Sequence, residues 1–281
     1  MNSDTEILLA GLTFPESPRW RENRLWFTDQ HARQVLTVTL DGKMECQLET
    51  EDLPGGLGWL PDGTLLLVAM TERKVYRLTE QGPVLHADLS SLAPFHCNDM
   101  VVAANGRAYV GNFGYDLHGG ESPVATCLVL VEPDGHCSIT ASALIFPNGS
   151  VITPDGSTLI VAETFASRLT AFTLGEDGLL YTPRLWADLK NATPDGICLD
   201  AEGALWVASP GTSELLRVDH AGTVLARIQP VGAPYACMLG GPDRRTLFIT
   251  TSETDDAAQA RVMQSGRIEI ARVAIPGAGL P

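Results

Sequence analysis

The chain has 281 residues, of which 44% are hydrophobic, and its 34 acidic against 19 basic side chains give a formal net charge of −15 at pH 7. A chain of this length and composition can bury a sizeable core, which excludes disordered and fibrous classes. The negative charge would be repelled by nucleic acids and by anionic membrane surfaces, so neither is an expected partner.

The apolar stretches of the sequence are all short. The longest, residues 65–70 and 127–131, have the length of a strand. They fall far short of the roughly 20 residues that a transmembrane helix needs. The first residues are acidic and lack the basic and apolar regions of a secretory signal. We therefore expect a cytoplasmic protein without a membrane span.

Short runs rich in Val, Leu, Ile, Thr and aromatic residues recur between turn-forming residues, and helical periodicity is hard to find. Six of these runs follow a turn signal, at intervals of about 40 to 50 residues, the period of four-stranded propeller blades. The runs are residues 24–28, 64–69, 108–111, 158–162, 204–208 and 246–250. A β-sandwich would not repeat one unit six times. The pattern predicts an all-β chain, with a single six-bladed β-propeller of four-stranded antiparallel blades as its one domain, residues 1–281.

The two ends of the chain offer a way to close the ring. Residues 6–10 and 266–274 are strand-like and belong to no other complete blade. If these segments pair, the ring is closed by its own N- and C-terminal strands, and fewer strand edges are exposed. Residues 252–265, between the last strands, are polar and rich in Ala, and they predict a long loop.

Several common catalytic signatures are absent from the sequence. The six cysteines form no C-x-x-C pair, which argues against a zinc ribbon and a thioredoxin-type site, and we expect most of them to be reduced core residues. Cys97 is expected to pack rather than to act as a nucleophile, because alternation along its strand points it away from its neighbours. No G-x-S-x-G or Walker sequence supports a serine hydrolase or a nucleotide-binding enzyme.

One unusual set of polar residues stands at the entries to the innermost strands of four predicted blades. In a propeller these entries gather at one end of the central channel. The four oxygen-bearing side chains are those of Glu16, Asn98, Asn148 and Asp195. Two carboxylates and two amide carbonyls suit a hard divalent cation and leave positions for water and substrate. Taken singly, Asn-Gly and Asp-Gly pairs are ordinary turn residues, but four polar residues at corresponding places in separate repeats favour a site.

On these residues the chain resembles the senescence-marker-protein, regucalcin and gluconolactonase family of six-bladed propellers, and more distantly drug-responsive lactonase and diisopropyl fluorophosphatase. The resemblance covers about residues 12–275. It is clearest in the segments 16–20, 98–107, 147–149 and 194–196. It implies metal ligands at Glu16, Asn148 and Asp195. It also implies that Asn98 neighbours the metal and contacts the substrate.

The resemblance further implies hydrolysis of a lactone, with one divalent ion polarising the ring carbonyl and stabilising the oxyanion. Asp195 is the implied general base that helps water to attack, because the family assigns proton transfer as well as ligation to that position. Glu16 would then hold the metal. We expect Ca²⁺, while Mg²⁺, Mn²⁺, Fe²⁺ and Zn²⁺ stay open, since mixed oxygen sites take different ions according to availability.

Two segments depart from the family pattern and bear on the substrate. Members that act on sugar lactones commonly carry arginine two positions before the asparagine, where this chain has His96. This histidine is expected to orient substrate, to serve as an accessory acid, or to be hydrogen-bonded at the channel rim without a catalytic role. Residues 111–116 also differ from the usual segment, and Phe113, Tyr115 and His118 are candidates for lining a less polar pocket. The expected substrate is therefore a sugar lactone or a less polar lactone.

Two other functions stay open. A related metal-dependent aryl esterase or organophosphate hydrolase could use the same metal to polarise a phosphoryl oxygen. A non-catalytic propeller scaffold could bind a basic partner through its acidic surface, although it would have no need of four polar residues in the channel. No heptad or long exposed apolar segment demands an oligomer, and we expect a monomer.

Overall fold

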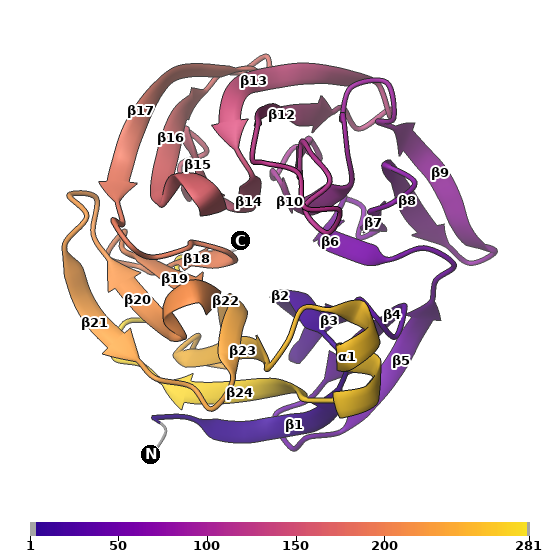
Figure 1. The fold of residues 1–281 in the computed structure, drawn as a ribbon. Helices are drawn as coiled ribbons and strands as arrows, with labels where there is room; N and C mark the ends of the chain where they lie inside the picture. Colours follow the sequence, from indigo (N-terminus) through magenta and orange to yellow (C-terminus); the bar gives the residue numbers. More distant parts are fainter. Residues whose placement is uncertain (1–3, 280–281) are drawn as a thin grey trace.

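The structure, a computed structural model, describes residues 4–279 as six four-stranded antiparallel sheets arranged in a ring (Figure 1). The innermost strands are β2 (Pro15–Arg21), β6 (Pro54–Trp59), β10 (Cys97–Val102), β14 (Pro147–Ile152), β18 (Ile197–Leu199) and β22 (Ala233–Gly240). The second strands are β3 (Arg24–Asp29), β7 (Leu65–Ala69), β11 (Ala108–Asn112), β15 (Thr158–Glu163), β19 (Leu205–Ser209) and β23 (Thr246–Ser252). The predicted six-bladed propeller is confirmed.

Each blade is completed by two further strands on its outer side. The third strands are β4 (Gln34–Val38), β8 (Lys74–Thr79), β12 (Ala125–Val131), β16 (Arg168–Leu174), β20 (Glu214–Val218) and β24 (Gly266–Arg272). The outermost strands are β5 (Met44–Glu49), β9 (Gly82–Asp88), β13 (Cys137–Ile145), β17 (Leu180–Asp188), β21 (Val224–Ile228) and β1 (Glu6–Leu12). The turns predicted between the first and second strands contain left-handed glycines such as Gly106 (φ +87°), a conformation that glycine adopts without a steric penalty.

The ring closes through the two ends of the chain. Strand β1 pairs antiparallel with β24, placing Glu6 opposite Ile270 and Ala10 opposite Arg267. The sixth blade therefore joins three strands from the end of the sequence to one from its beginning. This pairing confirms the predicted closure, and it leaves no blade with a missing outer strand.

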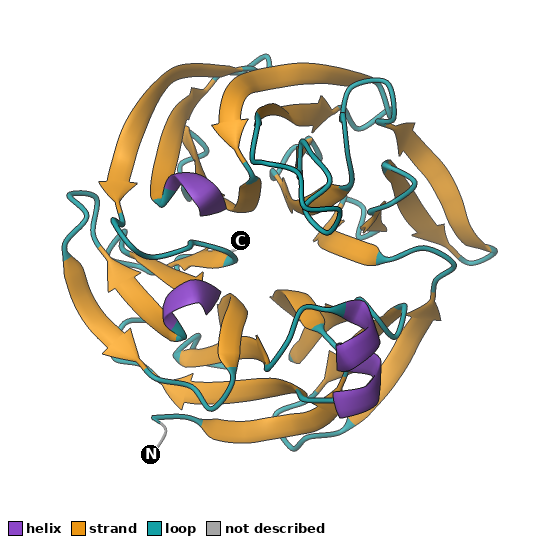
Figure 2. Ribbon diagram, in the orientation of Figure 1, coloured by secondary structure: helices purple, strands orange, loops and turns teal. Residues whose placement is uncertain are grey.

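The expected loop at residues 252–265 contains a short helix instead, α1 (Ala257–Met263). The side chain of Asp256 caps it by accepting a hydrogen bond of 2.8 Å from the Gln259 amide. Seven residues make only two turns, too few for a clear 3.6-residue pattern, so the sequence did not reveal it. The only other helices in residues 4–279 are the single turns η1 (Thr164–Ala166) and η2 (Pro210–Thr212) (Figure 2). None of these helices has the length and apolar character needed to cross a membrane.

The core lies between neighbouring blades. Each sheet is covered on both faces by its neighbours, so the second strands are buried along nearly their whole length and not on alternate residues: every residue of β7 and of β19 is buried. Aromatic rings fill the wider gaps between blades, as where Trp20 stacks on Phe248 with 5.2 Å between ring centroids. This packing fixes the inner strands around the channel and thereby positions the site.

Candidate functional site

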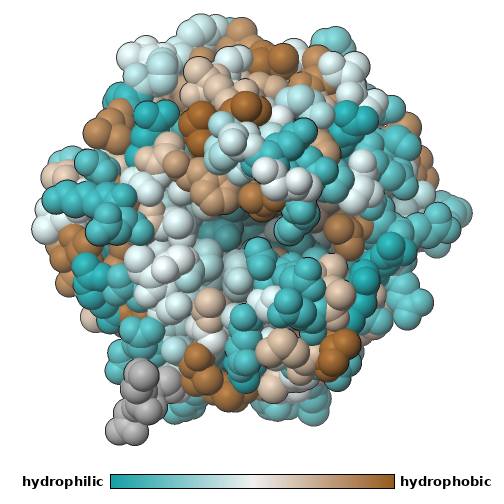
Figure 3. Space-filling view, viewed as in Figure 1, coloured by the Kyte–Doolittle hydropathy of each residue, from teal (hydrophilic) through white to brown (hydrophobic). Residues whose placement is uncertain are grey.

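The predicted site residues lie where the inner strands begin, at one end of the channel. Figure 3 shows this face hollowed at its centre, with hydrophilic residues inside. In five blades the register between the first two strands is interrupted at this place, three of them at candidate site residues. These three shifts fall between Glu16 and Arg19, between Cys97 and Met100, and between Pro147 and Ser150. Such bulges re-aim side chains out of the regular pleat, which explains how consecutive inner-strand residues come to face the channel.

Glycines after two of the candidate ligands allow neighbouring inner strands to approach closely. Asn148 and Gly149 lie inside strand β14 and not in a turn. A Cβ atom on Gly149 would stand 2.7 Å from the carbonyl oxygen of Asp195, and one on Gly196 would stand 2.3 Å from Cβ of Ala236. The interpretation of Asn148-Gly149 as an ordinary turn is therefore wrong, because this glycine makes room for the strand that follows.

The second blade has no polar side chain at the equivalent position, for a related reason. At the position that carries the polar side chain in other blades it has Gly55, followed by Gly56. A Cβ atom at these positions would stand 2.8 Å from the Asn98 carbonyl oxygen and 2.3 Å from the Met100 nitrogen, respectively. The glycines thus let β10, with its asparagine, lie directly against β6.

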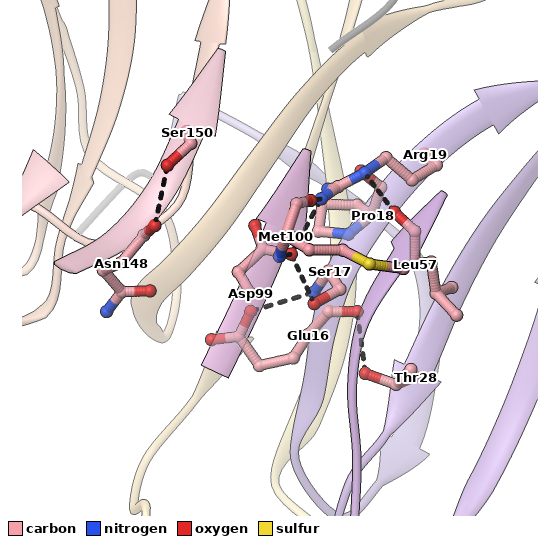
Figure 4. A network of polar contacts seen from close by, with 10 residues as sticks. All are labelled: Glu16, Ser17, Pro18, Arg19, Thr28, Leu57, Asp99, Met100, Asn148 and Ser150. Atoms are coloured by element: carbon pink, nitrogen blue, oxygen red, sulfur yellow. Dashed lines mark hydrogen bonds and ion pairs between the residues drawn. The ribbon is translucent and has the colours of Figure 1, made fainter. Parts of the chain in front are cut away.

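Glu16 is held by its own neighbour. Its Oε2 accepts a hydrogen bond of 2.9 Å from the backbone nitrogen of Ser17, a residue in the left-handed region with φ +50°. Figure 4 shows the carboxylate of Glu16 and the carboxamide of Asn148 on opposite sides of one space. Burial raises the pKa of Glu16 to about 8, and the negative charge of Asp99 adds to the rise. A carboxylate in this position is stabilised by any cation that enters.

Thr164 joins Asn148 to Pro194, the residue before Asp195. The Asn148 carboxamide nitrogen donates a hydrogen bond of 3.2 Å to Thr164 Oγ1, which in turn donates one of 2.8 Å to the carbonyl oxygen of Pro194. With its nitrogen engaged, the asparagine is left with its carbonyl oxygen to offer as a ligand. Burial, followed by the charge of Glu16, raises the pKa of Asp195 well above its usual value, although a hydrogen bond with Asn148 opposes the rise.

Asn98 differs from the other candidates in its hydrogen bonding. Its side chain is 9% exposed, and among the residues that the structure describes its carboxamide nitrogen has no partner. A buried donor without an acceptor costs stability unless a bound molecule supplies one. The position is therefore suited to an oxygen atom of a ligand.

The candidate pocket residues fall into two groups. His96 is half-buried, its ring lies 4.1 Å from that of Phe95, and burial lowers its pKa. His118 is exposed. By contrast, Phe113 and Tyr115 are buried in a hydrophobic cluster, where the ring of Phe113 lies 4.6 Å from that of Phe146. Of the four, the two histidines are therefore the more accessible to a substrate.

Sequence reasoning missed four residues beside the site: Arg19, Asp99, Thr164 and Tyr235. The pKa of Tyr235 is raised by burial and by the charges of Asp255, Asp195 and Glu16, which places its phenol near both carboxylates. A signal for it existed, because proline precedes the entry residue in Pro15-Glu16, Pro147-Asn148, Pro194-Asp195 and also in Pro234-Tyr235. Nothing comparable in the sequence marks Thr164.

Comparison with known proteins identifies the family. A model described as the SMP-30/gluconolactonase/LRE-like region matches residues 14–253. The chain belongs to this family. Among its relatives is a 6-deoxy-6-sulfogluconolactonase of Pseudomonas putida, 30% identical over 95% of this chain and 93% of that protein. A pentonolactonase of Haloferax volcanii is 25% identical over 91% of this chain and 87% of that protein.

The fold of the family is also found among solved structures. A regucalcin of Agrobacterium tumefaciens, titled a calcium-binding protein, superposes with a TM-score of 0.80, covering 98% of this chain and 95% of that one at 22% sequence identity. At this identity the likeness shows the fold alone. The family resemblance expected from the sequence is confirmed.

Proposed function

We propose that this chain is a metal-dependent lactonase that opens the ring of a small lactone at the mouth of the propeller channel. The observation that carries the proposal is that Glu16 and Asn148, from two blades, face one space, and that Asp195, from a third, interacts with both of them. The unpartnered carboxamide nitrogen of Asn98 adds to it. Relatives of this family named as lactonases for sugar acids support the reaction class. A non-catalytic scaffold would gain nothing from such a cluster.

The residues fit a hard divalent cation. Among residues 4–279, no group of three His, Cys, Asp or Glu side chains is arranged to hold a metal by those groups alone. The proposed set therefore relies on the amide oxygens of Asn148 and Asn98 besides two carboxylates, a mixture that favours Ca²⁺ or Mg²⁺ over Zn²⁺. Burial raises the pKa values of Glu16 and Asp195, neighbouring negative charge adds to the rise, and a cation would stabilise both carboxylates. We propose Ca²⁺.

Each residue then has a definite task. A bound divalent ion would supply polarisation of the lactone carbonyl and stabilisation of the negative charge that develops on it. Glu16 and Asn148 hold that ion, and Asn98 donates its free amide hydrogen to an oxygen atom of the substrate. Asp195 accepts a proton from the attacking water, in addition to serving as a ligand. The ring-opened product is a hydroxy acid.

The substrate class follows from the surface around this centre. The relatives named above act on sugar lactones, and a small lactone of that kind is the first candidate. The position before the inner strand of the third blade carries His96, a neutral or singly protonated ring, beside Phe95. A less polar lactone therefore stays within the proposal.

The test is a turnover measurement on sugar, aliphatic and aromatic lactones, with aryl and organophosphate esters as further substrates. The protein is assayed as purified, after treatment with chelator, and after Ca²⁺, Mg²⁺, Mn²⁺ or Zn²⁺ is restored singly. We expect a lactone to be hydrolysed, chelation to abolish the activity, and Ca²⁺ to restore it. Hydrolysis of no lactone in any metal would refute the lactonase proposal, and activity that survives chelation would refute the role of the metal.

A further inference from the structure

A buried arginine lies next to the proposed metal ligands. Arg19 is 5% exposed, and every nitrogen of its guanidinium group donates a hydrogen bond (Figure 4). Nε reaches the carbonyl oxygen of Leu57 at 3.1 Å, and Nη1 reaches that of Pro18 at 2.9 Å. Nη2 reaches the Met100 carbonyl oxygen at 2.8 Å and Asp99 Oδ1 at 2.7 Å. The arginine therefore connects the inner strands of the first three blades at the level of the site.

Asp99, the partner of this arginine, is a third carboxylate at the channel. Its side chain is 13% exposed, and the same Oδ1 also accepts bonds from Ser17 Oγ at 3.2 Å and from the Met100 nitrogen at 2.8 Å. Its charge contributes to the raised pKa values of both Glu16 and Asp195. Asp99 directly follows Asn98 and is hydrogen-bonded to Ser17, the neighbour of Glu16, so it lies close enough to affect a cation there although its Oδ1 is engaged elsewhere.

We propose that Arg19 sets the charge of the metal site by holding Asp99 in an ion pair, which keeps this third carboxylate out of the ligand set and cancels most of its charge. This inference rests on the metal site of the proposed function. Two carboxylates neutralise a divalent ion, whereas a third would bind it more tightly and weaken its polarisation of a carbonyl. Arg19 acts through Asp99 and is a positioning residue.

The geometry explains why arginine is suited to this role. The guanidinium group presents donors in a fixed planar fork, so one side chain can satisfy three carbonyl oxygens and a carboxylate together. A buried cation is tolerated when it is paired and fully hydrogen-bonded, as here. A purely structural role and a charge-setting role therefore share the same contacts, but they predict opposite changes in metal affinity.

The experiment measures Ca²⁺ affinity by isothermal titration calorimetry on the full chain, together with turnover at saturating Ca²⁺. Arg19→Gln keeps an amide donor and removes the charge, and Arg19→Met serves as a second neutral variant. We expect both to bind Ca²⁺ about tenfold more tightly, which corresponds to about 1.4 kcal/mol, while turnover falls. Asp99→Asn should bind about tenfold more weakly, and Arg19→Gln combined with Asp99→Asn should return to within about threefold of the parent.

A matched control is the ion pair of Arg217 with Asp200, whose side chains are 13% and 0% exposed. Arg217→Gln removes a comparable buried charge on strand β20, paired with an aspartate in the turn between β18 and β19, and should leave Ca²⁺ affinity unchanged. Weaker or unchanged Ca²⁺ binding by folded Arg19→Gln would overturn the inference in favour of a structural role.

The outcomes also separate this inference from the proposed function. A parent chain that binds no divalent ion would overturn both. Tighter Ca²⁺ binding by Arg19→Gln in a protein that hydrolyses no lactone would support the charge-setting role and refute the lactonase. Lactone hydrolysis that depends on Ca²⁺, with equal affinity in the parent and in Arg19→Gln, would refute only the charge-setting role.

Discussion

The carboxamide nitrogen of Asn148 donates a hydrogen bond of 3.2 Å to the hydroxyl of Thr164. This bond fixes which end of the carboxamide can face the channel, because the nitrogen is occupied and the oxygen is left to bind a cation. Thr164 is buried and follows strand β15, so its position is set by the packing of the fourth blade. Thr164 therefore holds the carboxamide of Asn148 in place.

We predict that Thr164→Val weakens Ca²⁺ binding. Valine has nearly the same shape but cannot accept the bond from Asn148 or donate one to Pro194, so the carboxamide can rotate. Loss of a group that orients a metal ligand typically costs about 10- to 100-fold in affinity. The free energy of unfolding should fall by about 1–2 kcal/mol, because two buried bonds lose a partner.

Calorimetry with Ca²⁺ and urea unfolding check this prediction. The matched control is Thr164→Ser, which keeps the hydroxyl and should bind Ca²⁺ within a few-fold of the parent. If the valine and serine variants bind equally well, the hydroxyl does not orient the ligand.

We predict that Gly56→Ala damages both the fold and the activity. The new Cβ would stand 2.3 Å from the backbone nitrogen of Met100, which cannot move without shifting strand β10 and the Asn98 side chain on it. Overpacking of this kind costs about 1–3 kcal/mol in stability. Lactone turnover should fall more than the population of folded protein does, because the displaced strand carries a site residue.

The control for this glycine is Gly203→Ala, in the turn between β18 and β19. Gly203 has φ +80° and no atom within 4 Å of a Cβ position, so alanine there adds backbone strain of about 1–2 kcal/mol without a clash. Comparing turnover per folded molecule in the two variants isolates the effect on β10. Equal turnover in both would contradict the prediction.

The sequence was sufficient for the repeating parts of this molecule. Turn residues and β-branched runs are local signals, so the second strands and the glycine turns could be placed from the chain alone. Closure by β1 was also predictable, since residues 6–10 and 266–274 were left without a blade. The short helix α1 was not, because seven residues carry no clear period.

The residues that surround the candidate ligands could not be predicted from the sequence. The positions of Asn148 and Asp195 stood out because they recur at equivalent points of the repeat. The roles of Arg19 and Thr164 depend on contacts between blades that are far apart in sequence, as in the bond from Arg19 to Met100. Bulges determine these contacts, and no local sequence pattern predicts where a bulge occurs. The sequence therefore identified candidate ligands but not the residues that hold them.

We predict that protonation of His86 destabilises the fold as the pH is lowered from about 7.5 to about 5.5. Burial, together with the charge of Arg77, lowers the pKa of His86 below its usual 6.5. Between its two pKa values this histidine binds more protons in the unfolded chain than in the folded chain, so its contribution favours unfolding as the pH falls. Glu16 and Asp195, whose pKa values are raised, contribute in the opposite direction, and comparing the parent with a His86 variant isolates the histidine.

His86→Gln removes this group, so by urea unfolding at both pH values the variant should be favoured over the parent more at about pH 5.5 than at about pH 7.5. The comparison is made in excess chelator, so that metal binding does not contribute. For each protein, the free energy of unfolding at the lower pH is compared with its own value at the higher pH. An unchanged pH dependence in His86→Gln would show that the imidazole is not kept neutral by the fold.

We predict that Asp195→Asn loses most of its lactone turnover while it stays folded. Asparagine keeps one oxygen that can bind a cation but cannot accept a proton from water, so the loss should reach about 10²- to 10⁴-fold at saturating Ca²⁺. Ca²⁺ affinity should fall as well, because a charged ligand becomes neutral. Burst and steady-state turnover at saturating Ca²⁺, with calorimetry alongside, separate the two effects.

The control is Asp200→Asn, which neutralises a buried aspartate at the far end of β18 and should retain parental turnover. An Asp195→Asn variant that binds Ca²⁺ normally and turns over at the parental rate would remove Asp195 from the chemistry and leave proton transfer to another group at the channel.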